Sequence, residues 1–165
     1  MTGPTLRFRS EDGRYAVELR KSSALALSRL GLAAGSRETG GILGGYYSAD
    51  GRTALVTEVA PPPADSRAGQ LFFDRGTEGL TAWLDRLWLA EPRQYYLGEW
   101  HVHLAAAAHP SGQDDHQMRT IGGNPIFCCP TPIMLIVATR VKPLPALGAF
   151  VYVSGHCLAL LPVRD

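Results

Sequence analysis

The stretch "EWHVHLAAAAHPSGQDDHQ", residues 99–117, holds four of the five histidines of this chain. His101 and His103 close the apolar and aromatic segment "YYLGEWHVH" (95–103), which predicts a buried strand. In a strand, side chains two residues apart point to the same face, roughly 6.6 Å apart along the chain. Both imidazoles can therefore approach one metal ion, although two ligands alone make a weak site.

Ser111 and Asp114 follow the histidines as a Ser-x-x-Asp pattern, which predicts that a helix begins there and extends over 111–123. The pattern is also a purely structural capping device, worth about 1 kcal/mol. As a third ligand, Asp114 would lie in the first helical turn and face back toward the end of the strand. Two His and one Asp leave a fourth position open for water, which is typical of a catalytic zinc site. Such a water ionises near pH ~7.

Two carboxylates can supply the general base that hydrolysis needs. Glu99 lies two residues before His101 and would face the same way in a regular strand. Glu38 lies far upstream in "SRETGGILGG", before Gly40 and Gly41, which allow close backbone approach. Local geometry does not choose between them. Trp100 alternates with the ligands and is expected to pack in the core.

Outside residues 99–117, hydrophobic periodicity and turn residues predict strands interleaved with helices. Asp-Gly turns indicate two hairpins, 5–9 with 15–20 and 40–48 with 53–61. Leucine spacing indicates helices over 22–35 and 77–92, and three prolines indicate a loop over 61–70. Strands are expected over 132–140, 148–154 and 157–163. This order favours an α/β domain with a mixed sheet.

Composition bounds the class of protein. A chain of 165 residues is expected to form a single domain, 1–165, and its 16 basic and 15 acidic residues are spread along it. Neither nucleic acid nor a membrane is therefore expected as the main partner. The N-terminus shows no signal-peptide pattern, and the apolar segments are too short to span a bilayer. The odd set Cys128, Cys129 and Cys157 fits a reducing cytoplasm, with Cys128 and Cys129 expected to be buried and inert.

Zinc nucleobase deaminases are excluded. Their chemistry needs His-x-Glu followed by Pro-Cys-x-x-Cys, whereas this chain has Pro125-Ile-Phe-Cys-Cys-Pro with adjacent cysteines.

Three segments resemble the JAMM motif of the JAB/MPN family: Glu38-Thr-Gly-Gly-Ile-Leu-Gly-Gly, Gly98-Glu-Trp-His-Val-His and Ser111-Gly-Gln-Asp114. The resemblance extends from about residue 15 to the end of the chain. It implies the MPN fold, a curved mixed sheet flanked by helices that is similar to cytidine deaminase. It also implies a zinc metalloprotease, a deubiquitinase-like isopeptidase that cleaves an isopeptide or peptide bond after the C-terminus of a ubiquitin-like or similarly conjugated protein.

The resemblance also implies the roles of the site residues. His101, His103 and Asp114 would be the Zn²⁺ ligands, and Glu38 the general base and acid that acts on zinc-bound water. Ser111 would steady the oxyanion, and Glu99 would be only a neighbour of the site.

The chain resembles bacterial stand-alone members, which include deconjugating enzymes of ubiquitin-like operons and antiphage systems and peptidases that trim sulfur-carrier proteins. The expected partner is a ubiquitin-like protein or its conjugate, bound through an extended C-terminal tail. The loops 61–69 and 104–110 are expected to form the walls around this tail. E1/E2-like conjugation enzymes of the same system are expected as further partners. A sulfur-carrier peptidase and a catalytically silent MPN scaffold are the alternatives. One departure is Leu104, where the family usually has Pro, followed by Ala105–Ala108.

Overall fold

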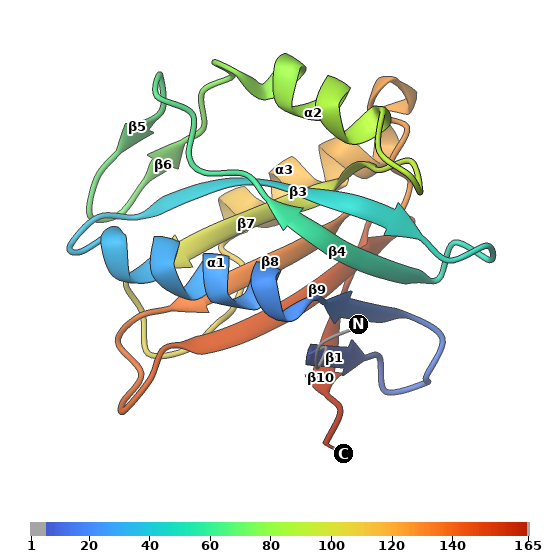
Figure 1. The fold of residues 1–165 in the computed structure, drawn as a ribbon. Helices are drawn as coiled ribbons and strands as arrows, with labels where there is room; N and C mark the ends of the chain where they lie inside the picture. Colours follow the sequence, from blue (N-terminus) through green and yellow to red (C-terminus); the bar gives the residue numbers. More distant parts are fainter. Residues whose placement is uncertain (1–5, 165) are drawn as a thin grey trace.

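Eight strands form one closed, curved sheet in the computed structural model, which describes residues 6–164 (Figure 1). The strand order around the sheet is β1-β10-β9-β8-β7-β3-β4-β2. The pairs β2–β4 and β7–β8 are parallel and the others antiparallel. The predicted α/β fold with a mixed, curved sheet is therefore confirmed, and its closure is an addition that the sequence did not indicate.

The elements follow the predicted order. They are β1 (Leu6–Arg9), β2 (Ala16–Leu19), α1 (Lys21–Ala33), β3 (Thr39–Tyr47), β4 (Thr53–Val59), β5 (Arg67–Ala68), β6 (Phe73–Asp74), α2 (Leu80–Trp88), β7 (Tyr95–His103), α3 (Gly112–Gly123), the 3₁₀ helix η1 (Pro125–Phe127), β8 (Ile133–Ala138), β9 (Ala146–Val153) and β10 (His156–Pro162). Thr5 of the first predicted strand lies outside the described residues, as do the ends of the predicted domain, 1–4 and 165. The predicted loop 61–70 was wrong in part, because it contains β5, which pairs with β6 in a small separate sheet.

The two faces of the sheet are covered by different helices. Helix α1 lies on one face and α3 on the opposite face, while α2 packs near β3 and β7 (Figure 1). Every residue of β8 is buried, because both of its faces are covered. This explains why the sequence of β8 is a continuous apolar run rather than an alternating one.

Strand β7 separates two cores. Trp100 and Val102 point into the core shared with α1, and Trp100 Nε1 donates to the Ala60 carbonyl at 2.9 Å. The core on the α3 side contains Met118, Met134 and Tyr152, with Tyr96 packed against it. The residues that alternate with Trp100, including both histidines of interest, therefore face α3. The prediction that Trp100 packs in the core is confirmed.

A bulge interrupts the pairing of β3 with β7. Leu43 pairs with Gly98, but the next residue, Gly44, pairs with Tyr96, so β7 carries one extra residue. Gly98 adopts φ 150°, and a side chain there would collide with the Ile133 carbonyl of β8. The bulge brings Tyr96 and Glu99, three residues apart, to the same face of β7.

Candidate metal centre

The carboxylate of Asp114 meets both histidines at the end of β7. Its Oδ1 lies 2.7 Å from Nδ1 of His101, and its Oδ2 lies 3.1 Å from Nε2 of His103. His101 and Asp114 are buried, and His103 is partly buried. Asp114 in the first turn of α3 thus faces back toward the end of the strand, as the sequence predicted.

The position of Asp114 follows from how α3 begins. The Ser111 side chain accepts from the Asp114 backbone N–H at 3.1 Å, and Asp114 Oδ2 accepts from the Ser111 N–H at 2.7 Å, which completes a capping box. The same carboxylate thus caps the helix with one oxygen and reaches His101 with the other. Capping and ligand roles are compatible here.

The donor atoms of the three side chains lie within 4.8 Å of one another, so this group could hold a metal ion. A tetrahedral zinc site with bonds of about 2.1 Å separates its ligand atoms by roughly 3.4 Å, so only small side-chain movements are needed. His101 Nε2 is buried and has no hydrogen-bond partner among the described residues. A buried ring nitrogen without a partner is costly unless a ligand satisfies it. The residues present therefore fit a metal.

Strand β3 packs closely behind His101. Gly40 pairs with His101, and a Cβ atom added at Gly40 would collide with the His101 ring and lie 2.6 Å from the Trp100 carbonyl and 2.9 Å from the Phe73 ring. The ring of Phe73 meets the His101 ring edge-on, with centroids 5.7 Å apart. Gly40 and Phe73 thus fix the orientation of the imidazole.

Burial and hydrogen bonding act in opposite directions on the pKa values of the cluster. Burial would raise the pKa of Asp114, but hydrogen bonds with His101 and His103 bring it well below its usual range. Burial would lower the pKa of His103, but its contact with Asp114 and the nearby charge of Glu38 raise that pKa. Asp114 is therefore an anion, the form in which a carboxylate binds metal.

Glu38 lies beside this cluster. It comes directly before β3, one step beyond the Thr39–Val102 pair, which puts it opposite His103 in the continued register. Glu38 lines the same cavity of about 240 Å³ as His101, His103, Ser111 and Asp114. Burial raises the pKa of its carboxyl group, and the nearby histidines partly oppose this. A carboxylate with a raised pKa is a better proton acceptor.

Glu99, the competing carboxylate, is fully buried and bonded elsewhere. Its Oε2 accepts from Nε of Arg75 at 2.9 Å, and its Oε1 accepts from the Tyr96 hydroxyl at 3.0 Å. Burial raises the pKa of Glu99, and the charge of Arg75 opposes this. Burial also raises the pKa of Tyr96 well above its usual value, so that hydroxyl keeps its proton and donates it. With both oxygens occupied, Glu99 is less available than Glu38 to water in the cavity.

The remaining walls of the cavity are largely apolar. Leu104 and Ala105 line it, as the sequence suggested for that loop. Leu71 and Phe73 of the β5–β6 hairpin also line it, whereas residues 61–69 do not. Sequence reasoning missed this hairpin. The available signal was the apolar run Leu71-Phe72-Phe73 directly after a proline-rich loop.

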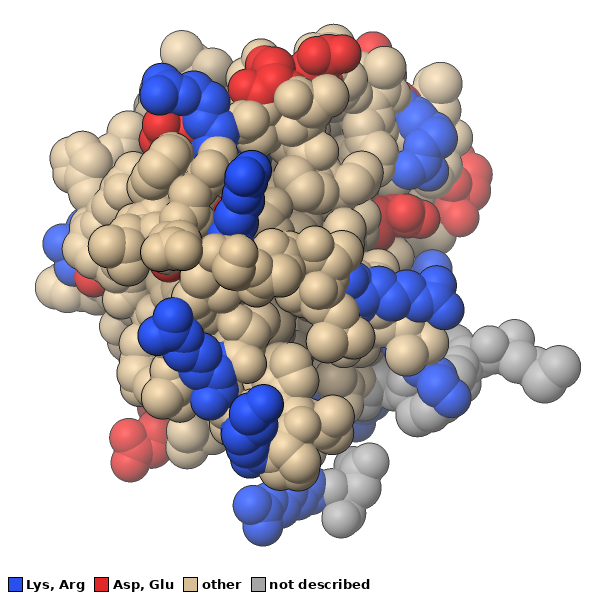
Figure 2. Space-filling view, turned by 90° about the vertical axis from the view of Figure 1, so that its left-hand side faces the viewer, with Lys and Arg blue, Asp and Glu red and all other residues tan. Residues whose placement is uncertain are grey.

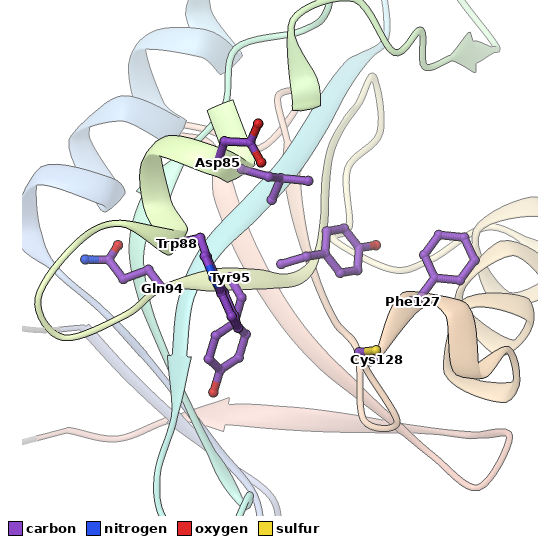
Figure 3. Close-up of a pocket in the computed structure, with 8 residues that line it drawn as sticks. Asp85, Trp88, Gln94, Tyr95, Phe127 and Cys128 are labelled. Carbon is purple, nitrogen blue, oxygen red and sulfur yellow. The ribbon is translucent and has the colours of Figure 1, made fainter. Parts of the chain in front are cut away.

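A second cavity, of about 550 Å³, lies at the opposite end of β7. Trp88 of α2 and Tyr95 lie on one side of it, and Phe127 and Cys128 lie on the other (Figure 3). The expectation that Cys128 is buried was wrong: it is exposed, because η1 ends there with a left-handed residue, φ 48°. Cys129 is buried, as expected.

The face drawn in Figure 2 carries separated Lys and Arg side chains among neutral residues, with Asp and Glu mainly toward its upper and right margins. This distribution agrees with the nearly balanced composition. None of the helices within the described residues is long and apolar enough to cross a membrane.

Comparison with known proteins decides the family. Residues 20–150 match the family described as prokaryotic homologs of the JAB domain. The chain belongs to this family. The resemblance to JAB/MPN proteins that the motif indicated is thus confirmed.

Two individual proteins are similar to this JAB-family chain. The CD-NTase/cGAS isopeptidase of Enterobacter hormaechei subsp. hoffmannii (strain UCI 50) is 40% identical over 130 residues, which span 79% of this chain and 71% of the relative. A protein from Desulfitobacterium hafniense, known from its solution structure, superposes with a TM-score of 0.61 over 88% of each chain at 19% identity. The second likeness supports the fold alone.

Proposed function

We propose that this protein is a zinc-dependent isopeptidase that hydrolyses the bond after the C-terminus of a ubiquitin-like or similarly conjugated protein. The observation that carries this proposal is the buried cluster of His101, His103 and Asp114, which shares one cavity with Glu38. Membership of the JAB family and the 40% identity to a protein named as an isopeptidase support it.

Two imidazoles and one carboxylate are the donor set of many catalytic zinc sites, which keep a fourth position open. When bound there, zinc would act as a Lewis acid that polarises the scissile carbonyl and lowers the pKa of water at the site to about 7. His101, His103 and Asp114 would hold it.

Glu38 would act as the proton carrier. Its carboxylate takes a proton from the attacking water, whose oxygen forms a bond to the carbonyl carbon. Glu38 then gives that proton to the lysine nitrogen as the carbon–nitrogen bond breaks, since an unprotonated amine is a very poor leaving group. The partial burial that raises the pKa of Glu38 makes its carboxylate a stronger base for the first of these transfers.

Ser111 would stabilise the negative charge that develops on the carbonyl oxygen. Its Oγ already accepts the capping hydrogen bond from the Asp114 N–H, so its own proton remains available for donation. A single donor of this kind contributes about 3 kcal/mol to the transition state.

The substrate would enter as an extended tail. The apolar walls formed by Leu71, Phe73, Leu104 and Ala105 fit small or apolar side chains near the scissile bond. The two-stranded β5–β6 sheet lies beside the cavity, and within residues 6–164 each of its strands pairs only with the other, which suits strand addition by a tail. Because the Enterobacter relative is named for a CD-NTase, conjugates of a CD-NTase are the first substrates to test.

Zinc content by elemental analysis, together with cleavage assays, tests the proposal. Wild type and Glu38→Ala should each hold about one zinc per chain. Only wild type should release a lysine-linked CD-NTase or ubiquitin-like conjugate. Cleavage restricted to a linear peptide extension would favour a sulfur-carrier peptidase, and zinc without any cleavage would favour a scaffold.

A further inference from the structure

The buried ion pair between Arg75 and Glu99 has no part in the chemistry proposed above. The Glu99 side chain is 0% exposed and that of Arg75 is 18% exposed, so both charges are largely removed from water. A buried ion pair is weak support for stability, since apolar residues of similar size often replace it at no cost. The pair does, however, constrain geometry. Arg75 Nε donates to one oxygen of Glu99, and Arg75 Nη1 donates to the Gly76 carbonyl at 3.0 Å. The pair therefore fixes where the chain passes at residue 75.

Arg75 directly follows the β5–β6 hairpin, whose strands have only two residues each. So short a hairpin is not stable by itself. Hydrogen bonds within the segment join the two ends of the hairpin, because the Asp65 carboxylate accepts from the N–H groups of Thr77 and Glu78 at 3.0 and 2.9 Å. These bonds shape the hairpin but do not attach it to the sheet. The bond from Arg75 to Glu99 of β7 does.

The anchored hairpin touches the candidate site at several points. The Gly69 carbonyl accepts from the backbone N–H of Glu38 at 2.7 Å. Phe73 meets the ring of His101 edge-on, and Leu71 reaches the cavity wall. Glu38 lies just before β3, so its backbone N–H does not bond within that strand. The bond to the Gly69 carbonyl ties Glu38 to the hairpin instead.

We propose that Arg75 and Glu99 are positioning residues: their ion pair fixes the β5–β6 hairpin to β7, and the hairpin in turn holds Glu38 opposite His103. This deepens the proposed function and rests on it for the role of Glu38. Misplacing a catalytic group by about 1 Å lowers rates by roughly a hundredfold, so loss of the anchor reduces turnover without removing any group that reacts.

The test separates positioning from stability. The variants are Arg75→Met, Glu99→Leu and their double combination, with Arg86→Met as the matched control, because Arg86 forms an exposed ion pair with Glu58 at 3.8 Å. Each single buried variant leaves one charge unpaired and lowers Tm, whereas the double variant removes both charges and recovers part of the loss by apolar packing, although the Tyr96 hydroxyl lacks its acceptor there as it does in Glu99→Leu.

Positioning predicts that the Glu38 amide exchanges hydrogen faster in Arg75→Met and in the double variant, as followed by NMR. It also predicts that kcat/KM per bound zinc stays at least about tenfold below wild type in the double variant, despite its partly recovered Tm. The Arg86→Met control should stay within about twofold of wild type.

Two results would overturn the inference. The first is wild-type exchange of the Glu38 amide in Arg75→Met, and the second is a double variant that recovers kcat/KM together with Tm. Should wild type cleave no conjugate at all, the proposed function fails while the exchange measurement still decides whether the ion pair anchors the hairpin.

Discussion

Oδ1 of Asp114 lies 2.7 Å from Nδ1 of His101, although the two residues come from different elements, the start of α3 and the end of β7. The second oxygen of the same carboxylate closes the capping box with the Ser111 N–H. Helix capping and the candidate metal cluster therefore depend on one side chain. Any change that displaces α3 also displaces the side chain that we propose as the third ligand.

Asp114→Ala should remove the response of stability to zinc. In wild type, zinc that binds only to the folded state should raise Tm as the zinc concentration increases. The variant loses one of the three proposed zinc-binding side chains and also the hydrogen bond from the Ser111 N–H that closes the capping box, which costs about 1 kcal/mol even without metal. Thermal unfolding of chelator-treated protein, with and without added zinc, measures both effects. An equal zinc-dependent rise in Tm in the variant would exclude Asp114 as a ligand.

Glu38→Gln should retain zinc and the fold while losing turnover by about 10²–10⁴-fold, the usual contribution of general acid–base catalysis. The amide is nearly the same size as the carboxylate but accepts no proton at neutral pH. Single-turnover assays of zinc-loaded protein provide the measurement. Residual activity within tenfold of wild type would return the role of base to Glu99.

Ser111→Gly and Ser111→Ala separate the two roles of this hydroxyl. Glycine at the N-cap costs only a few tenths of a kcal/mol, whereas alanine costs about 1 kcal/mol. Both variants lack the oxyanion donor, so kcat should fall by about 10²–10³-fold in each. Chemical denaturation and steady-state kinetics on the same samples give the comparison. A kcat that follows stability, with glycine close to wild type, would leave Ser111 as a cap only.

Gly40→Ala should weaken zinc binding and destabilise the fold by about 1–3 kcal/mol, because the new methyl group overlaps the His101 ring and crowds the Trp100 carbonyl. Gly123→Ala is the matched control, since no atom lies within 4 Å of a Cβ at that position. Zinc titration with a competing chelator reports the affinity. Unchanged zinc affinity in Gly40→Ala would show that His101 reorients freely.

Cys128 should react with a thiol reagent at pH 8 well before Cys129. Cys128 is exposed, whereas burial raises the pKa of Cys129 to about 11. Since the thiolate is the reactive form, Cys129 reacts only as the pH rises toward that value or as the protein unfolds. Mass spectrometry of timed iodoacetamide labelling, with Cys128→Ser as control, resolves the two sites. Prompt labelling of Cys129 in the folded control variant would contradict its burial.

Much of the fold followed from local rules in the sequence. Apolar and aromatic content predicted β7 with its observed bounds, and Ser-x-x-Asp predicted the start of α3 to within one residue. The Asp-Gly turns at Gly13 and Gly51, both with φ 71°, were equally readable, because only glycine adopts that conformation freely. These features depend on neighbours within a few residues, so the sequence alone determined them.

The tertiary structure decided what long-range pairing controls. The pairing of β3 with β7 puts Glu38 opposite His103, a relation that the family motif implied but that local geometry left open. The bulge puts Tyr96 and Glu99 on one face of β7, where the Tyr96 hydroxyl donates to Glu99, and Arg75 reaches the same carboxylate from the segment after β6. Register, bulges and sheet closure arise only when strands that are distant in sequence pair with each other. A hairpin as short as β5–β6 shows too little periodicity for its pairing to be predicted from the sequence. Local sequence placed the candidate ligands on their elements, and the tertiary structure brought Glu38 into the cavity that they line and bonded Glu99 elsewhere.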